Sequence, residues 1–93
     1  MTDQQLIEKI EDLDIRNYLE AVLFGLEGAE IWRPKWPKDI IHALAILTEK
    51  GGKLTQATLQ YEDGSGELVK VEAEAVQAAA MALRFLKNMP NYG

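Results

Sequence analysis

Apolar residues recur at helical spacing along most of this chain. In the first thirty residues they fall three or four positions apart, as in amphipathic helices. They are Leu6, Ile7, Ile10, Leu13, Tyr18, Leu19, Val22, Leu23 and Leu26. Thr2 or Asp3 is suited to cap the start of this pattern, because short polar side chains accept bonds from the first free amides. The pattern predicts an N-terminal helical segment over residues 1–30.

Polar and turn-forming residues predict the interruptions in this first segment. A break near Asp14 is expected, since Asp can cap a second helix. Gly25 or Gly28 is suited to end that helix. The stretch EIWRPKWPKD at residues 30–39 predicts a loop, because each proline disfavours helix at the residue before it.

Two further helices are predicted in the second half of the chain. The central one spans residues 38–62, with a proline and an aspartate at its start. Its apolar face holds Ile41, Leu44, Ala45, Leu47 and Leu54. The turn EDGSGE then separates it from a C-terminal helix over residues 68–89, which Pro90 ends.

No strand pattern of any length is present, so we expect a single all-α domain over residues 1–93 with three to four helices. These helices carry apolar residues on more than one side, and a long exposed apolar stripe favours self-association. We therefore expect a homodimer or homotetramer in which helices from different chains complete a bundle.

Charge and composition narrow the function classes. Residues 1–30 carry eight acids and two bases (net −6), residues 31–53 two acids and five bases (+3), and residues 54–93 five acids and three bases (−2). A dominant basic face is missing, so nucleic acid is an unlikely partner, whereas a small anionic ligand at the central segment stays open.

No cysteine is present, which excludes thiolate chemistry. With no membrane-length apolar run and no signal-peptide pattern, we expect a cytoplasmic protein.

The stretch TEKGGKLTQA poses the main chemical question. Gly51 and Gly52 interrupt the predicted central helix, at about 1 kcal/mol each relative to Ala. Lys50 and Lys53 flank them three residues apart, on one helix face. The spacing GGK is not a phosphate-binding loop, because GxxxxGK[ST] after a strand is missing. With one histidine, a histidine-rich metal site is excluded too.

Residues 36–87 resemble the MazG-like all-α nucleoside triphosphate pyrophosphohydrolases. The resemblance lies in WPKDIIHALAILTEKGGKLTQATLQY and the later EAVQAAAMALRFL. Those enzymes carry EExxE on one helix and ExxD on the next. The resemblance implies that these acids bind Mg²⁺, which holds a (d)NTP for hydrolysis to the monophosphate and pyrophosphate.

The motif acids are only partly present here. EExxE falls on Glu49 to Lys53, and ExxD on Glu74 to Gln77. The resemblance implies catalytic and Mg²⁺-binding roles for Glu49 and Glu74, whereas Lys50, Lys53 and Gln77 replace expected ligands. Ammonium groups cannot bind Mg²⁺ and would repel it. We therefore expect the metal site to be degraded and hydrolysis to be weak or absent.

The replaced positions leave several roles open. Lys50 and Lys53 could pair with Glu74 or Glu49 and join the two helices, or bind phosphate directly together with Gln77. Arg84 continues the face of Glu74 and Gln77, as a substrate contact or in a structural salt bridge.

The aromatic loop has two interpretations as well. Trp32 and Trp36, among Arg33, Lys35 and Lys38, suit either a base-stacking platform or a cover for helix ends. The resemblance further implies that Trp36, Asp39 and His42 shape the site entrance.

Two rivals to the leading interpretation are a non-catalytic acidic helical interaction or inhibitor module, as from a mobile element, and an enzyme still active through Glu49, Glu74 and water.

Overall fold

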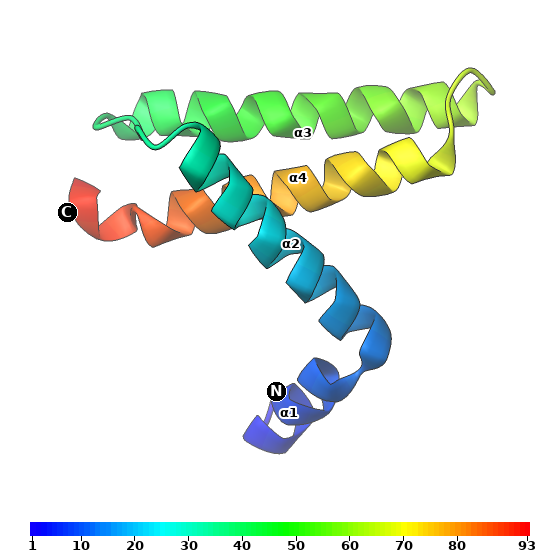
Figure 1. The fold of residues 1–93 in the computed structure, drawn as a ribbon, viewed down its shortest axis with the longest axis horizontal. Coiled ribbons are helices and arrows are strands. Elements are labelled where there is room, and N and C mark those ends of the chain that lie inside the picture. Colours follow the sequence, from blue (N-terminus) through cyan, green and yellow to red (C-terminus); the bar gives the residue numbers. More distant parts are fainter.

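The computed structural model describes all 93 residues and confirms an all-α chain without strands. Four α-helices are followed by a short 3-10 helix: α1 (Asp3–Glu11), α2 (Leu13–Trp32), α3 (Ile40–Glu62), α4 (Leu68–Lys87) and η1 (Met89–Tyr92). Figure 1 shows α3 and α4 as an antiparallel hairpin, which α2 crosses obliquely. The end of α2 that is remote from the hairpin carries α1. None of the helices has the length and apolarity needed to cross a membrane.

The N-terminal helices begin at side-chain caps. The Thr2 hydroxyl accepts a bond from the Gln5 amide at 3.2 Å, and the Gln5 side chain accepts one from the Thr2 amide at 2.8 Å. This reciprocal pair is a capping box. The break before α2 falls at Asp12, two residues before the predicted position, where the Asp12 carboxylate accepts from the Ile15 amide at 3.1 Å.

The prediction that Gly25 or Gly28 ends the N-terminal helix is wrong, because α2 continues through both to Trp32. Gly25 faces α4 instead. A Cβ placed there would lie 3.5 Å from the Ala80 Cβ, whereas one at Gly28 would meet nothing within 4 Å. Gly25 therefore packs against α4, where a Cβ would make an ordinary contact and only a larger side chain would press on Ala80. A sequence cannot distinguish this packing position from a helix stop.

The α3–α4 hairpin is closed as predicted. Asp39 caps α3 by accepting from the Ile41 amide at 3.1 Å. At the other end Gly64 adopts φ +83°, which side chains other than glycine rarely tolerate. A Cβ at Gly66 would lie only 2.9 Å from the Gln60 Cβ, so this turn needs both glycines. The last helix ends at Lys87 rather than Met89, and Pro90 lies within η1.

The core of the chain is small and made mainly of short side chains. Its buried residues are Ala43, Ala57, Ala80, Met81 and Arg84. Alanines bring the helix backbones together but cover little area, so most large aliphatic residues of α1 and α2 remain exposed. The fold is therefore held by a narrow seam between α4 and its two neighbours.

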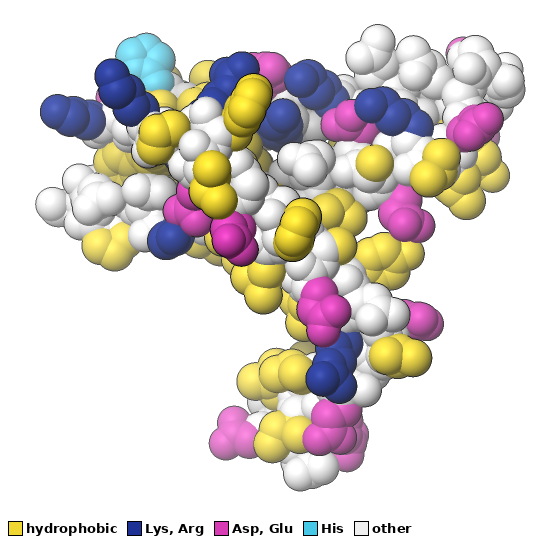
Figure 2. All heavy atoms as spheres, in the orientation of Figure 1, with side chains coloured by type: hydrophobic (Ala, Val, Ile, Leu, Met, Phe, Trp, Pro, Cys, Tyr) yellow, Lys and Arg dark blue, Asp and Glu magenta, His cyan; other side chains and the backbone are white.

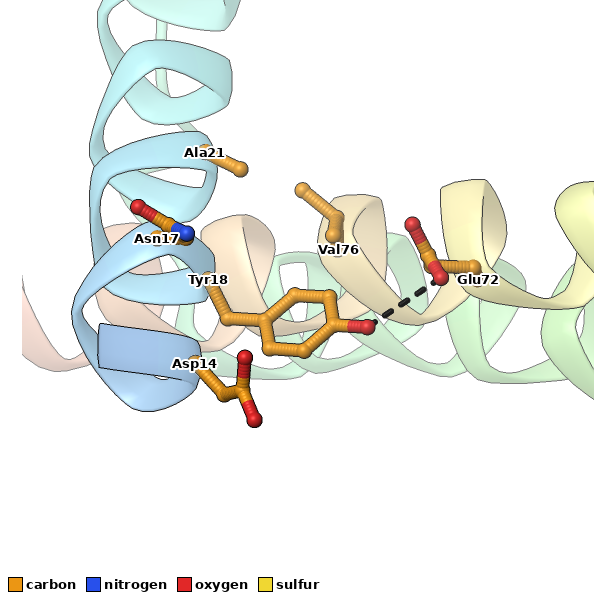
Figure 3. Close-up of a pocket in the computed structure, with 6 residues that line it drawn as sticks. All are labelled: Asp14, Asn17, Tyr18, Ala21, Glu72 and Val76. Atoms are coloured by element: carbon orange, nitrogen blue, oxygen red, sulfur yellow. Dashed lines mark hydrogen bonds between the residues drawn. The ribbon is translucent and has the colours of Figure 1, made fainter. Parts of the chain in front are cut away.

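A polar contact joins the N-terminal half of α2 to α4. The Tyr18 hydroxyl donates to the Glu72 carboxylate at 3.1 Å, across a shallow groove that Asp14, Asn17, Ala21 and Val76 complete (Figure 3). The bond to Glu72, followed by the charge of this carboxylate, raises the pKa of Tyr18.

Substituting Gly25 by Val is expected to lower the free energy of unfolding by about 1–3 kcal/mol, because the larger side chain forces α2 away from Ala80. Urea denaturation followed by circular dichroism measures it. Gly28→Val is the matched control on the same helix, since it faces open space. Equal losses in both variants would contradict the packing role of Gly25.

Candidate functional site

A cleft of about 590 Å³ lies between the C-terminal half of α2, the following loop, α3 and α4. Its volume is in the range of small-molecule sites. Three aromatic side chains line it, from Phe24, Trp32 and Trp36. Its charged and amide side chains come from Arg33, Lys35, Glu49, Lys50, Lys53, Gln77 and Arg84. The cleft thus combines apolar rings with cations.

The charge of the cleft is strongly positive although the chain is acidic. Five basic residues and a single acid, Glu49, line it, for a formal net charge of +4. Figure 2 shows Lys and Arg side chains over α3 and the loop before it, and Asp and Glu side chains on α1 and α2. Clustered cations in a concavity raise the local concentration of anions. The ligand that this cleft suits is therefore anionic.

Helical spacing predicts that Lys50, Lys53, Glu74 and Gln77 face one another, and the structure places Lys50, Lys53 and Gln77, but not Glu74, in the wall of one cleft. Lys53 lies 3.7 Å from Glu49 on the same helix, and both side chains are largely exposed. Such a pair contributes little energy and opens easily. Lys50 is half-buried and makes no ion pair, so its ammonium group is free to meet a ligand.

Glu74 does not line the cleft, but the charges of the cleft residues Lys50 and Lys53 affect its pKa. Its side chain is 14% exposed and pairs with Lys70 at 2.9 Å on the same helix. The bond from Lys70 lowers the pKa of Glu74, with smaller contributions from the charges of Lys50 and Lys53. The ion pairs of Glu49 and Glu74 each join residues of one helix, so no Lys–Glu pair links α3 to α4.

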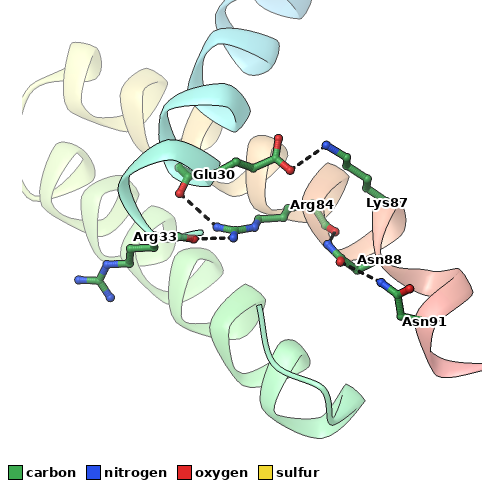
Figure 4. Close-up of polar contacts among 7 residues, drawn as sticks. Glu30, Arg33, Arg84, Lys87, Asn88 and Asn91 are labelled. Carbon is green, nitrogen blue, oxygen red and sulfur yellow. Dashed lines mark hydrogen bonds and ion pairs between the residues drawn. The ribbon is translucent and has the colours of Figure 1, made fainter. Parts of the chain in front are cut away.

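Arg84 is buried and takes a structural role different from the expected salt bridge. Its guanidinium group donates to the carbonyl oxygens of Arg33 at 2.6 Å and Ala29 at 3.3 Å, in the last turn of α2 (Figure 4). A cation at the C-terminal end of α2 also interacts favourably with the negative end of the helix dipole. Arg84 therefore caps α2 from α4 and closes the floor of the cleft.

Trp36 packs on the other side of Arg84. The guanidinium carbon lies 4.9 Å from the centre of the Trp36 ring, a cation–π distance. The indole nitrogen donates to the Tyr92 hydroxyl at 2.7 Å, which in turn donates to the Pro37 carbonyl at 2.8 Å. Trp36 thus fixes the loop and the chain end, as the covering role predicted.

Trp32 fits the stacking role better, because it is 83% exposed at the rim of the cleft. Phe24, eight residues earlier on α2, is also exposed and lines the cleft, and the sequence analysis missed it. The sequence does carry a signal that places Phe24 beside Trp32. Phe24, Gly28 and Trp32 recur every four residues, which places them along one side of a helix.

Other predicted site residues lie apart from the cleft. His42 does not line it, and its side chain is 77% exposed, with Nδ1 3.2 Å from an Asp39 oxygen. Gly51 and Gly52 lie inside a continuous α3, and a Cβ at either would meet nothing within 4 Å. No part of this chain therefore makes use of the space that they leave.

The residues present do not fit a Mg²⁺ site of the MazG type. Glu49 is next to Lys53, and Glu74 is held by Lys70. Mg²⁺ needs oxygen ligands, and the ammonium groups of Lys50 and Lys53 supply none. The donor set favours an anion over a divalent cation.

Comparison with known proteins reveals no relative. No protein-family model, no curated protein and no solved structure matches this chain. The resemblance to MazG-like enzymes therefore stays a prediction that rests on the residues themselves.

Replacing Arg84 by Met is expected to cost about 1–3 kcal/mol of stability, because the Arg33 and Ala29 carbonyls lose their donor. Lys87→Met is the control, since the exposed Lys87–Glu30 pair is worth below about 1 kcal/mol. Chemical denaturation of both variants measures the difference. Similar losses of stability in both variants would show that the hydrogen bonds of Arg84 to α2 do not stabilise the fold measurably.

Acid is expected to destabilise the chain less when Glu74 is replaced by Gln. Because the folded-state pKa of Glu74 is lowered, its contribution is present above its unfolded pKa, about 4.3. This contribution is lost as the pH falls below that value through the folded-state pKa. Unfolding free energies measured from pH 7 to pH 3 test this, with Glu67→Gln as control. If the unfolding free energy of Glu74→Gln fell with pH as steeply as that of the parent chain, the contribution of Glu74 would be contradicted.

Proposed function

We propose that this chain binds a (d)NTP or a related nucleotide in the cleft and hydrolyses it weakly or not at all. The observation that carries the proposal is the composition of the cleft: five cations, three aromatic rings and one carboxylate. A triphosphate offers several negative charges and a base offers a flat apolar face. Cations for the phosphates and rings for the base line the same concavity, whose volume suits a small molecule.

The lysines of α3 supply the phosphate contacts in this proposal. Arg84 is occupied by two carbonyl groups, so Lys50 and Lys53 are the cations that the helical hairpin offers to a ligand. An ammonium group acts on phosphate as a mobile point charge. Arg33 and Lys35 add charge from the loop. Lys53 has only to leave its weak exposed pair with Glu49.

The exposed rings of Trp32 and Phe24 supply the base contact. Stacking of a base on an aromatic side chain is worth about 1–3 kcal/mol and tolerates any base. Rings at an open rim can accept a base without displacing the core. The proposal therefore includes weak selectivity among bases.

The resemblance to MazG-like enzymes supports a nucleotide as the ligand, and the donor set argues against Mg²⁺-assisted hydrolysis. With Lys50 and Lys53 in place of acids, phosphate oxygens meet ammonium groups rather than a metal ion. Without a metal ion, the clamp on attacking and leaving oxygens is lost. The proposed activity is binding, by a MazG-like chain whose catalytic site is degraded.

The alternative candidate is a non-catalytic interaction module, and one observation favours it. The aliphatic residues of α1 and α2 are widely exposed, as on a protein-binding surface. Neither nucleotide nor metal would then raise the melting temperature.

Nucleotide binding is expected without metal. Because both tryptophans line the cleft, their fluorescence reports a base that enters it. Titration with dATP and dGTP in EDTA should quench the signal. Lys50→Gln/Lys53→Gln should weaken binding at least about tenfold, equivalent to about 1.4 kcal/mol.

The control is Lys9→Gln/Arg16→Gln, which removes the same charge from exposed sites on α1 and α2. It should bind like the parent chain. Equal weakening in both double variants would indicate general charge attraction, and no binding by the parent chain would overturn the proposal. Competition by inorganic triphosphate separates the phosphate contribution from that of the base.

A further inference from the structure

Two glycines lie in the interior of α2, and the packing of the chain accounts for only one of them. Gly25 packs against Ala80 of α4, where a larger side chain would press on its neighbour. Gly28 is exposed, and a Cβ placed there would meet nothing within 4 Å. Glycine is the poorest helix former after proline. At position 28 it therefore weakens the helix with no gain in packing within the chain.

The space that Gly28 leaves opens into the cleft. Among the glycines with no neighbour within 4 Å, Gly28 is the one that lines the cleft, whereas Gly51 and Gly52 of α3 do not. The missing side chain at position 28 thus enlarges the proposed ligand site, and a molecule in the cleft can use this space.

The two exposed rings of the cleft stand on either side of Gly28. Phe24 lies four residues before it and Trp32 four residues after it, so that all three share one side of α2. Phe24 is 80% exposed and Trp32 is 83% exposed, and both line the cleft. With a helical rise of about 1.5 Å per residue, their Cα atoms lie about 12 Å apart. We call the space between the two rings, above Gly28, the ring gap.

The ring gap has room for one flat ring. A base in van der Waals contact with an aromatic ring on each face needs those two rings about 7–8 Å apart. The ring gap is wider, so a base can enter it and stack after a small rotation of an exposed side chain. A larger side chain at position 28 would occupy the same space, because residues four apart on a helix contact one another.

We propose that Gly28 is the residue that makes the cleft selective for a nucleotide, because its missing side chain leaves the ring gap open to a base. This inference rests on the proposed nucleotide binding and adds the residue that decides whether the ligand carries a ring. The lysines of α3 attract any polyphosphate. A base gains stacking contact in the ring gap, whereas inorganic polyphosphate gains none. Because stacking tolerates any base, the ring gap selects for a ring and not for its identity.

Gly28→Leu tests this inference, because it fills the ring gap from a helix other than the one that carries Lys50 and Lys53. Calorimetric titrations in EDTA give the affinities of the full chain for dATP and for inorganic triphosphate. In Gly28→Leu we expect dATP binding to weaken at least about fivefold, the low end of what one base–aromatic stack contributes. Inorganic triphosphate should bind as it does to the parent chain. The melting temperature should not fall, because leucine favours helix and position 28 faces open space.

Gly52→Leu is the matched control. It places the same side chain at an exposed helical position that has no neighbour within 4 Å and lies outside the cleft. It should bind both ligands like the parent chain. Gly28→Ala gives a graded test, since its smaller side chain fills less of the ring gap and should reduce dATP affinity less than Gly28→Leu does.

Unchanged dATP affinity in Gly28→Leu would overturn the inference and leave nucleotide binding standing. Equal losses for both ligands, or an equal loss in Gly52→Leu, would also overturn it, because they would indicate a general disturbance of the cleft. Unfolding of Gly28→Leu would show that the fold itself uses this space, which contradicts the inference as well. A parent chain that binds inorganic triphosphate as tightly as dATP would contradict the ring gap alone. A parent chain that binds neither ligand would contradict the proposed function too.

Discussion

The guanidinium group of Arg84 is the interaction on which the arrangement around the cleft depends. From α4 it holds the last carbonyls of α2, and its other face lies under the ring of Trp36. Through Trp36 it is linked to Tyr92, which in turn bonds the Pro37 carbonyl. One buried cation thus joins two segments that are distant in sequence, residues 29–37 and residues 84–92. Together with the hydrogen bonds of Tyr92, it holds the loop that carries Arg33 and Lys35.

The second constraint is the shortage of large buried side chains. Alanines and Gly25 let α2, α4 and α3 approach, but they cover little apolar area. Two features of the molecule follow from this narrow seam. A cleft stays open where α2 diverges from α3, and the aliphatic residues of α1 and α2 stay in solvent. The same packing therefore underlies both the proposed ligand site and the exposed aliphatic face of α1 and α2.

Helix identity could be predicted from the sequence, since the apolar spacing and the caps at Thr2 and Asp39 are local signals. The end of α2 could not, because a glycine that admits a neighbouring helix looks the same as one that stops a helix. Helical spacing fixes the faces of Lys50, Lys53 and Gln77, so their common cleft could be predicted, whereas Glu74, expected with them, pairs with Lys70 instead. The cap made by Arg84 and the place of Trp36 arise from contacts more than fifty residues apart in the chain, which no local pattern encodes.

In the function that we propose, Lys50 and Lys53 stand where the resemblance places metal-binding acids, so that the cleft holds a nucleotide without cleaving it. The decisive assay is pyrophosphate release from a panel of dNTPs with Mg²⁺ or Mn²⁺. The chain would be assayed beside a variant that carries Lys50→Glu, Lys53→Glu and Gln77→Asp. The account predicts background release by the parent chain and measurable, metal-dependent release by the variant. Rapid metal-dependent turnover by the parent chain would contradict it.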